Sequence, residues 1–299
     1  MPLDTPANAG ILEFMNYRSE TDALSALGHP GRLSVFRLLA RRAPGGVRPS
    51  DLAEALAMAP SSLAAHLSAL QRAGLVLHAR DGRVVTYRLD LTRTAGLIDF
   101  LVNDCCRGRP DLVAPLAASP MSPVKEGQRP MSDQLFKVLF ICTRNSARSI
   151  FAEAILNKEG AGKFQGFSAG TQAGSSLNPH AIELLQRMGH DTSPLRSKHV
   201  SEFQGPDAPQ MDFVFTVCDR AANEDCPPWQ GQPLSAHWGL PDPVKAAGVE
   251  SEKGLAFLQA YRTLYHRLQG FLALPVATLD RISLQRRLDD LGQQSPPAA

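Results

Sequence analysis

The stretch "LFICTRNSARSIFAEA", residues 139–154, places a cysteine between an apolar run and a segment with helical character. Residues 136–141 form a short run rich in large apolar side chains, which is typical of a strand buried on both faces of a parallel sheet. After a tight loop, residues 149–160 predict a helix that Gly160 ends. Strand, loop and helix in this order predict an α/β domain with Cys142 at the carboxyl end of the strand.

The loop after Cys142 has the composition of an anion cradle. Its backbone N–H groups and the helix N-terminus converge on one tetrahedral oxyanion, and the Arg148 guanidinium offers two parallel hydrogen bonds. These positive surroundings favour a thiolate, so we expect a lowered pKa for Cys142 and a nucleophilic sulfur at neutral pH. Ser149 is placed to donate its hydroxyl to that sulfur. The predicted oxyanion-binding loop comprises Thr143, Arg144, Asn145, Ser146, Ala147 and Arg148.

Residues 135–272 resemble the low-molecular-weight protein tyrosine phosphatase superfamily, which includes arsenate reductases of the same fold. The C-x5-R-[ST] loop and a later Asp-Pro in "GLPDPVK" carry this resemblance. It implies a three-layer α/β domain with a parallel four-stranded sheet, and Asp242 as proton donor to the departing oxygen. Two positions depart from the phosphatase pattern. Val244 stands where many members have an aromatic residue, and Arg144 replaces a glycine, so either that backbone is not left-handed or an extra charge borders the pocket.

Two further cysteines follow the apolar strand predicted at residues 213–217, in "VFTVCDRAANEDCPPWQG". In arsenate reductases of this fold a similar region passes oxidation outward, which implies Cys218 as the resolving thiol and Cys226 as the thiol that receives the disulfide. The order of these two thiols stays open. Arsenate reduction requires such a thiol to attack sulfur, whereas a phosphatase needs only water. We expect no permanently bound cofactor and an external reductant, either thioredoxin-like or glutathione with glutaredoxin.

The N-terminal part reads as a winged helix-turn-helix domain, mainly α with a β-hairpin wing. Gly and Pro at 28–31 separate two short amphipathic helices, and a helix is predicted over 60–73 with Leu63, Leu67 and Leu70 on its inner face. A hairpin is expected around Asp81-Gly82. Small and polar side chains on the outer face of the 60–73 helix suit a major groove, and arginines flank the wing tip. The predicted DNA-contacting residues are Ser61, Ser62, Ala65, His66, Ser68, Arg80 and Arg83.

The segments "ALGHPGRLSVFRLL", "SSLAAHLSALQRAGLV" and "DGRVVTYRL" resemble the ArsR-type winged-helix repressors. This resemblance implies operator DNA as a partner and a homodimer in which the helix at 92–106 packs across a two-fold axis. Cys105 and Cys106 end that helix, where neighbouring cysteines in some relatives bind trivalent arsenic or antimony through soft thiolates. The third nearby cysteine of that pattern is missing. The alternative is that one of the two thiols packs in the core and the other is an idle surface group.

The length of 299 residues suits two domains. We predict a DNA-binding and dimerisation domain at 1–107, a linker at 108–134, an arsenate reductase or phosphatase-like domain at 135–292, and a disordered tail at 293–299. The net charge of +2 neither favours nor excludes nucleic acid. Without a signal peptide or an apolar run approaching about 20 residues, and with only five cysteines, the protein is expected to be cytoplasmic, away from membranes and in a reducing compartment.

These observations predict a bifunctional arsenic-resistance protein. A repressor responsive to trivalent arsenic would be fused to an enzyme that converts arsenate to arsenite through a cysteine–arsenic adduct and a disulfide relay. Two alternatives remain open at this stage. One is a tyrosine phosphatase fused to a DNA-binding regulator, and the other is a regulator whose C-terminal half senses an oxyanion without catalysis.

Overall fold

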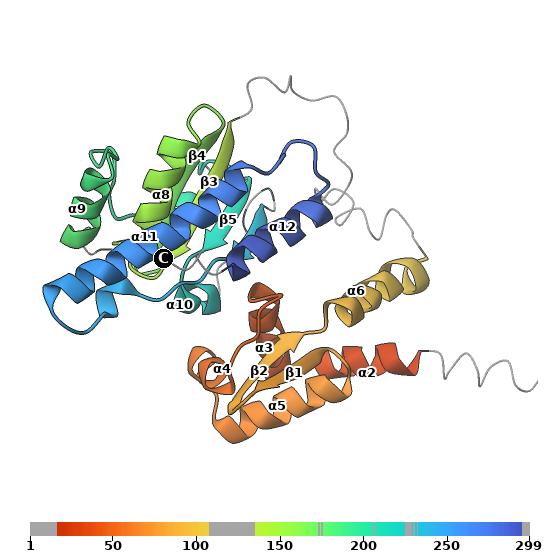
Figure 1. Ribbon diagram of the computed structural model, residues 1–299. Helices are drawn as coiled ribbons and strands as arrows, with labels where there is room; N and C mark the ends of the chain where they lie inside the picture. Colours follow the sequence, from red (N-terminus) through yellow and green to blue (C-terminus); the bar gives the residue numbers. More distant parts are fainter. Residues whose placement is uncertain are drawn as a thin grey trace, which may run out of the picture. The chain divides into compact units, whose positions relative to one another are not determined.

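A computed structural model describes residues 17–107 and 135–294, apart from positions 173, 175, 206, 225–228, 230 and 232. The chain falls into two compact units divided between residues 115 and 116 (Figure 1). The predicted linker, residues 295–299 of the predicted tail, and Cys226 lie outside the described residues.

The N-terminal unit consists of helices followed by a two-stranded antiparallel hairpin. Leu63, Leu67 and Leu70 are at most 2% exposed, so the apolar face of the predicted 60–73 helix is buried. The predicted winged helix-turn-helix arrangement is confirmed. Its elements are α2 (Arg18–Leu27), α3 (Pro30–Arg41), α4 (Pro49–Ala55), α5 (Pro60–Arg72), β1 (Val76–Asp81), β2 (Val84–Leu89), α6 (Leu91–Asp99) and η1 (Phe100–Cys105).

The wing turns one residue later than the sequence predicts. Asp81 pairs with Val84 at the end of the ladder, so Gly82 and Arg83 form the connection instead of Asp81-Gly82. Gly82 adopts a φ of +57°, a left-handed conformation that glycine reaches without steric cost. The change moves Arg83 into the turn itself.

The helix predicted over 92–106 is not uniform. α6 ends at Asp99, and η1 continues it as a π-helix through Cys105, with the Cys106 N–H donating to the Leu101 carbonyl at 3.0 Å. This wider turn changes the angle between successive side chains relative to an α-helix. Cys105 is exposed and Cys106 is half-buried at its end.

The C-terminal unit contains the predicted parallel four-stranded sheet with flanking helices, in the strand order β4-β3-β5-β6. Asn178 caps α9 (Pro179–Arg187), since its side chain accepts from the His180 N–H. The elements are β3 (Phe136–Cys142), α8 (Arg148–Glu159), β4 (Phe164–Gly170), α9 (Pro179–Arg187), η2 (Val200–Phe203), β5 (Phe213–Thr216), α10 (Asp219–Asn223), β6 (Leu234–His237), η3 (Pro243–Lys245), α11 (Glu250–Leu272) and α12 (Arg281–Gln293).

The strand order reverses at β3, because the chain continues first to β4 on one side and later to β5 on the other. In open α/β sheets, ligands bind outside the carboxyl ends of the strands at such a point. Ile141 pairs with Thr216, and the Val217 N–H donates to the Ile141 carbonyl at 2.8 Å. Cys142 and Cys218 therefore follow neighbouring strands at the same edge of the sheet.

The longest helix, α11, packs against α8 and α9 and buries Phe257, Leu264 and Leu268 in the core of this unit (Figure 1). Within the described ranges, no helix combines the length and apolar character needed to cross a membrane.

Candidate active site

The Cys142 side chain lies at the base of the loop that joins β3 to α8. Cys142 is 3% exposed, and its sulfur accepts a hydrogen bond from the Asn145 backbone N–H at 3.0 Å. The Ser149 hydroxyl lies 2.9 Å from the same sulfur. Because α8 begins at Arg148, the first turn of this 12-residue helix borders the thiol, as the sequence predicts.

The pKa of Cys142 is shifted in the direction opposite to the one expected from the sequence. Burial raises the pKa of this thiol, against the lowering effects of the Ser149 hydroxyl, the Asn145 N–H and the Arg148 charge. The expectation of a lowered pKa is wrong here, because a sulfur that is almost fully removed from water loses more hydration as a thiolate than these groups return.

This direction predicts how alkylation of Cys142 depends on pH. The thiolate is the reactive form, so the rate with iodoacetamide should be low at neutral pH and continue to rise above the pKa of an ordinary thiol. Ser149→Ala should move the profile to still higher pH, because it removes a donor that lowers the pKa. Mass spectrometry of the peptide containing Cys142 follows the rate. A plateau reached below neutral pH would contradict the prediction.

Asn145 fixes the direction of the hydrogen bonds that end at the sulfur. Its side-chain oxygen accepts from the Lys198 backbone N–H at 2.6 Å, so its amide nitrogen must face the other partners. That nitrogen donates to the hydroxyls of Ser149 and Ser168 at 2.9 and 2.7 Å. Since the Ser149 oxygen already accepts from Asn145, its own proton is available to the Cys142 sulfur.

A buried ion pair stands at the far end of this chain of hydrogen bonds. The Ser168 hydroxyl donates to Glu153 Oε2 at 2.5 Å, and Lys198 Nζ lies 2.9 and 3.0 Å from the two Glu153 oxygens. Burial raises the pKa of Glu153, while the charge of Lys198 opposes that shift. None of these three residues was predicted from the sequence to belong to the site. A signal for one of them exists: Glu153 is the one charged residue in the stretch 149–156 of α8, which is buried on all sides.

We expect Lys198→Met to destabilise the C-terminal domain by about 3–5 kcal/mol, because Glu153 would remain buried without its cation. The double variant Lys198→Met/Glu153→Leu should recover most of this loss. The deficit of the single variant should shrink at acidic pH, since a carboxyl group with a raised pKa takes up a proton there. Urea unfolding of the three proteins measures these differences. A double variant as unstable as the single one would contradict the prediction.

The loop backbone explains how the chain accommodates Arg144 where phosphatases carry glycine. The left-handed residue is Asn145, with a φ of +51°, and Arg144 is not among the residues with positive φ. Arg144 is exposed and adds a positive charge at the rim of the loop. Gly170 at the end of β4 lets the loop approach closely, because a Cβ there would lie 2.8 Å from the Thr143 carbonyl oxygen. This role of Gly170 was not predicted from the sequence.

Arg148 connects the loop to the segment that carries Asp242. One guanidinium nitrogen lies 3.0 Å from Asp242 Oδ2, and the other donates to the Leu240 carbonyl at 3.1 Å. Asp242 Oδ1 also accepts from the Val244 N–H at 3.2 Å, which starts η3. The structure thus brings together the predicted anion-binding arginine and the predicted proton donor. The Val244 side chain is 46% exposed and replaces the aromatic residue of many phosphatases at this border.

Cys218 lies beside the loop as the strand register requires. Its sulfur is 3.4 Å from the hydroxyl of Thr143, the residue after Cys142, and its side chain is buried. The same sulfur accepts from the Ala221 N–H and caps the short helix α10. The predicted partner thiol, Cys226, lies outside the described residues.

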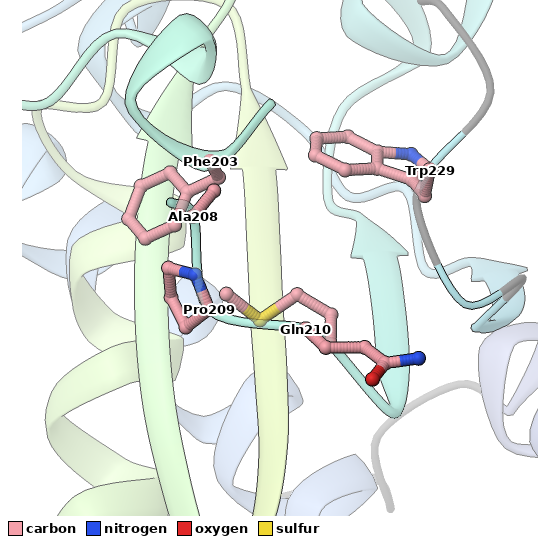
Figure 2. A pocket seen from close by; sticks show the side chains of 6 residues that line it. Phe203, Ala208, Pro209, Gln210 and Trp229 are labelled. Carbon is pink, nitrogen blue, oxygen red and sulfur yellow. The ribbon is translucent and has the colours of Figure 1, made fainter. Parts of the chain in front are cut away.

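A small pocket of the same domain lies elsewhere. Figure 2 shows Phe203, Ala208 and Pro209 on one side and Trp229 on the other. Met211, which also lines it, precedes the first residue of β5, whereas Cys142 is the last residue of β3. Because these strands are parallel, the pocket borders the amino ends of the strands, opposite the edge that carries the thiols.

The residues predicted to contact DNA lie on α5 and the wing of the N-terminal unit. Ser61, Ser62, Ala65 and Ser68 are exposed on the outer face of α5, and Arg80 and Arg83 are exposed at the wing. His66 differs from the others because it is half-buried. Its ring lies 4.9 Å from that of His29, and burial lowers its pKa. The imidazole of His66 therefore also packs on the start of α3.

Comparisons with known proteins match the division of the chain into an N-terminal and a C-terminal unit. Residues 137–282 match the family described as low molecular weight phosphotyrosine protein phosphatase, and residues 27–79 match a helix-turn-helix domain. The arsenate reductase of Bacillus licheniformis is 34% identical over 135 residues, which cover 45% of this chain and 93% of that protein. The chain belongs to the low molecular weight phosphotyrosine protein phosphatase family. The family resemblances predicted from the sequence motifs are confirmed. We refer to residues 137–282 as the phosphatase-family domain.

Other relatives and solved structures each resemble one part of this chain. A glutaredoxin arsenate reductase of Synechocystis is 36% identical over 107 residues, 36% of this chain and 78% of that protein. A solved arsenate reductase in the phosphate binding state is 29% identical, with a TM-score of 0.39 over 46% of this chain and 98% of that one. An ArsR-like transcriptional regulator from Rhodococcus is 22% identical, with a TM-score of 0.29 over 34% of this chain and 93% of that one.

Outside the phosphatase-family domain, the predicted arsenic ligands Cys105 and Cys106 are free thiols on successive residues of one helix end. Among the described residues, no group of three or more His, Cys, Asp or Glu side chains is arranged to hold a metal ion. The two thiols thus stand without a third described ligand of these types, in line with the missing third cysteine in the sequence.

Proposed function

We propose that this protein is a thiol-dependent arsenate reductase fused to a DNA-binding regulator that responds to trivalent arsenic. The observation that carries the enzymatic part is a second buried thiol, Cys218, just after β5, the strand next to the one that Cys142 ends. Hydrolysis of a phosphate ester needs no such thiol. The named arsenate reductases similar to this domain support the same substrate.

In the proposed reaction, the Cys142 sulfur attacks arsenic while Arg148 and the loop N–H groups hold the oxyanion. A sulfur–arsenic bond forms, an arsenic–oxygen bond breaks, and Asp242 gives its proton to the departing oxygen, which leaves as water. The protonated Cys142 thiol with an arsenate dianion carries the same total number of protons as the Cys142 thiolate with an arsenate monoanion. The raised pKa of Cys142 is therefore compatible with attack, since the bound oxyanion can accept the thiol proton.

Reduction follows when the Cys218 thiolate attacks the Cys142 sulfur. The sulfur–sulfur bond forms, and the electron pair of the sulfur–arsenic bond stays on arsenic, which leaves as arsenite. Cys226 then attacks Cys218 and releases Cys142, and an external dithiol reduces the remaining disulfide. The glutaredoxin arsenate reductase among the relatives supports a glutathione and glutaredoxin system as one candidate reductant. Thioredoxin is the other.

A direct assay tests this proposal. The purified full chain is supplied with arsenate and either thioredoxin with its reductase or glutathione with glutaredoxin, and arsenite is measured over time. We expect catalytic arsenite formation with at least one system. Hydrolysis of p-nitrophenyl phosphate without arsenite formation in either system would instead favour the tyrosine phosphatase, which the family membership and the Arg148–Asp242 pair support as a second candidate.

For the regulator, we propose that α5 enters the major groove of operator DNA, that the wing arginines contact the backbone, and that two copies form the binding unit. Arsenite bound by Cys105 and Cys106 would release the DNA. Operator release by arsenite should therefore require both thiols and should be lost in Cys105→Ser/Cys106→Ser. Release by arsenate with reductant should in addition require Cys142. Equal release by arsenate in Cys142→Ser would show that the two activities are not coupled.

A further inference from the structure

The C-terminal helix α12 lies almost entirely beyond the residues matched to the phosphatase family, which end at 282. It packs against α11 and the edge strand β6 through Leu284, Leu288 and Leu291, all of which are buried (Figure 1). Gln285 donates to the Ser235 carbonyl of β6 at 2.8 Å. α12 is therefore an integral part of this domain, next to the strand that leads into the Asp242 segment.

Two contacts join α12 to the residues directly after β6. The Trp238 indole N–H donates to the Leu288 carbonyl at 2.9 Å, and the indole ring stacks on Phe215 with centroids 4.2 Å apart. Gly292 approaches so closely that a Cβ there would lie 2.6 Å from the His237 carbonyl oxygen and 2.8 Å from Trp238 Cδ1. The position of α12 thus depends on the absence of a side chain at residue 292.

Arg267 of α11 also contacts both the residues after β6 and the end of α12. Its guanidinium donates to the Trp238 and Gly239 carbonyls at 2.9 and 3.3 Å, and to the Gln294 carbonyl just after α12 at 3.2 Å. Arg267 is 6% exposed. One buried side chain therefore ties the start of the Asp242 segment to the end of α12.

The other end of the segment 238–242 is held by Arg148 of the active site. Arg148 donates to the Leu240 carbonyl and pairs with Asp242, as described above. Residues 238–242 thus span from an anchor made by α12 and Arg267 to the arginine of the oxyanion loop. A shift of the first anchor changes where the Asp242 carboxyl group stands relative to the loop.

We propose that α12, with Trp238, Gly292 and Arg267, is a positioning element that sets the place of the Asp242 carboxyl group for proton transfer to the departing oxygen. This inference rests on the proposed function for the role of Asp242. It assigns a role in turnover to a helix that lies almost entirely beyond the family-matched residues and acts through Trp238 and Arg267 within them, without contact to the substrate.

Gly292→Ala tests the proposal, with Gly254→Ala as the matched control. Both replace a helical glycine by alanine in the same domain, but a Cβ at Gly254 has no atom within 4 Å. We expect Gly292→Ala to lower kcat with arsenate by about 10- to 100-fold, the scale of a misplacement of about 1 Å in a catalytic group. KM and the alkylation rate of Cys142 should stay near wild type, because the oxyanion loop is unchanged. Gly254→Ala should retain wild-type kcat.

A double-mutant cycle with Asp242→Asn separates positioning from general damage. If α12 acts through Asp242, Gly292→Ala should lower kcat no further once that carboxyl group is gone. An equal loss in both backgrounds, or wild-type kcat in Gly292→Ala, would overturn the proposal. Trp238→Phe gives a second route should Gly292→Ala fail to fold, since it keeps an aromatic ring against Phe215 while it removes the hydrogen bond to Leu288 and part of the buried ring volume. Its loss of kcat should likewise vanish in the Asp242→Asn background.

The wild-type protein distinguishes failure of this inference from failure of the proposed function. Absence of arsenite formation in the wild type refutes arsenate reduction, and the same cycle is then run with phenyl phosphate, whose departing phenolate is basic enough to need a proton. Activity of the wild type with equal losses in both Asp242 backgrounds refutes the positioning role alone.

Discussion

Cys142→Ser is expected to lower arsenite formation by on the order of 10⁴-fold or more, because the hydroxyl neither attacks arsenic effectively nor forms the disulfide that supplies two electrons. The substitution is nearly isosteric. A serine oxygen can keep the contacts with the Asn145 N–H and the Ser149 hydroxyl, so the loop should retain its conformation. Arsenite assayed with saturating reductant measures the loss, and thermal unfolding checks the fold.

Cys105→Ser is the matched control for this experiment, since it removes an exposed thiol from the other unit of the chain. Its arsenite formation should equal that of the wild type. Substantial arsenite formation by Cys142→Ser would mean that another thiol accepts the oxyanion. In that case the buried sulfur at the end of β3 would not be the nucleophile, and the Cys-x5-Arg loop would only bind the anion.

The parts of this site that lie close together in sequence were predictable. Cys142, Ser149 and Arg148 sit within one strand–loop–helix unit, where local backbone geometry requires the spacing that the sequence displays. The thiol at 218 was also predictable, because it closely follows a second apolar strand and parallel strands end at a common edge.

The supporting network was not predictable in the same way. Ser168 lies on β4 and Lys198 lies in a loop. Asn145 joins both of them to the thiol, and each is more than 20 residues away from Asn145 in sequence. Such contacts depend on how the elements pack. Glu153 is the one charged residue among 149–156, which is a signal for a buried partner. The sequence does not identify Lys198 as that partner.

Burial also explains the wrong sign of the Cys142 pKa. The sequence shows the donors and the charge that stabilise a thiolate, and both are present in the structure. It does not show how completely the sulfur is removed from water, which is the largest cause of the shift. The π-helical end of the α6 segment escaped prediction for a similar reason, since its apolar spacing also fits an α-helix.

Cys218→Ser should abolish sustained arsenate reduction and spare hydrolysis of p-nitrophenyl phosphate. Without the sulfur at 218, the described residues offer no second thiol beside Cys142 to attack its sulfur and release arsenite, whereas water still completes phosphate ester hydrolysis. The fold should survive, because a serine oxygen can accept the Ala221 N–H as the sulfur does and cap α10. Parallel assays of both substrates on the same protein preparation measure the split. Equal loss of both activities would point to structural damage instead of a lost electron donor.

Cys226→Ser distinguishes the order of the two thiols. If Cys218 attacks first, as its place at the end of β5 beside the loop favours, Cys226→Ser should release about one arsenite per chain in a rapid burst and then slow sharply. Cys218→Ser should show no burst. The reverse pattern, a burst only in Cys218→Ser, would assign the first attack to Cys226. The slow phase is expected because the two sulfurs of a Cys142–Cys218 disulfide would both be almost completely enclosed, whereas an external dithiol needs access to one of them.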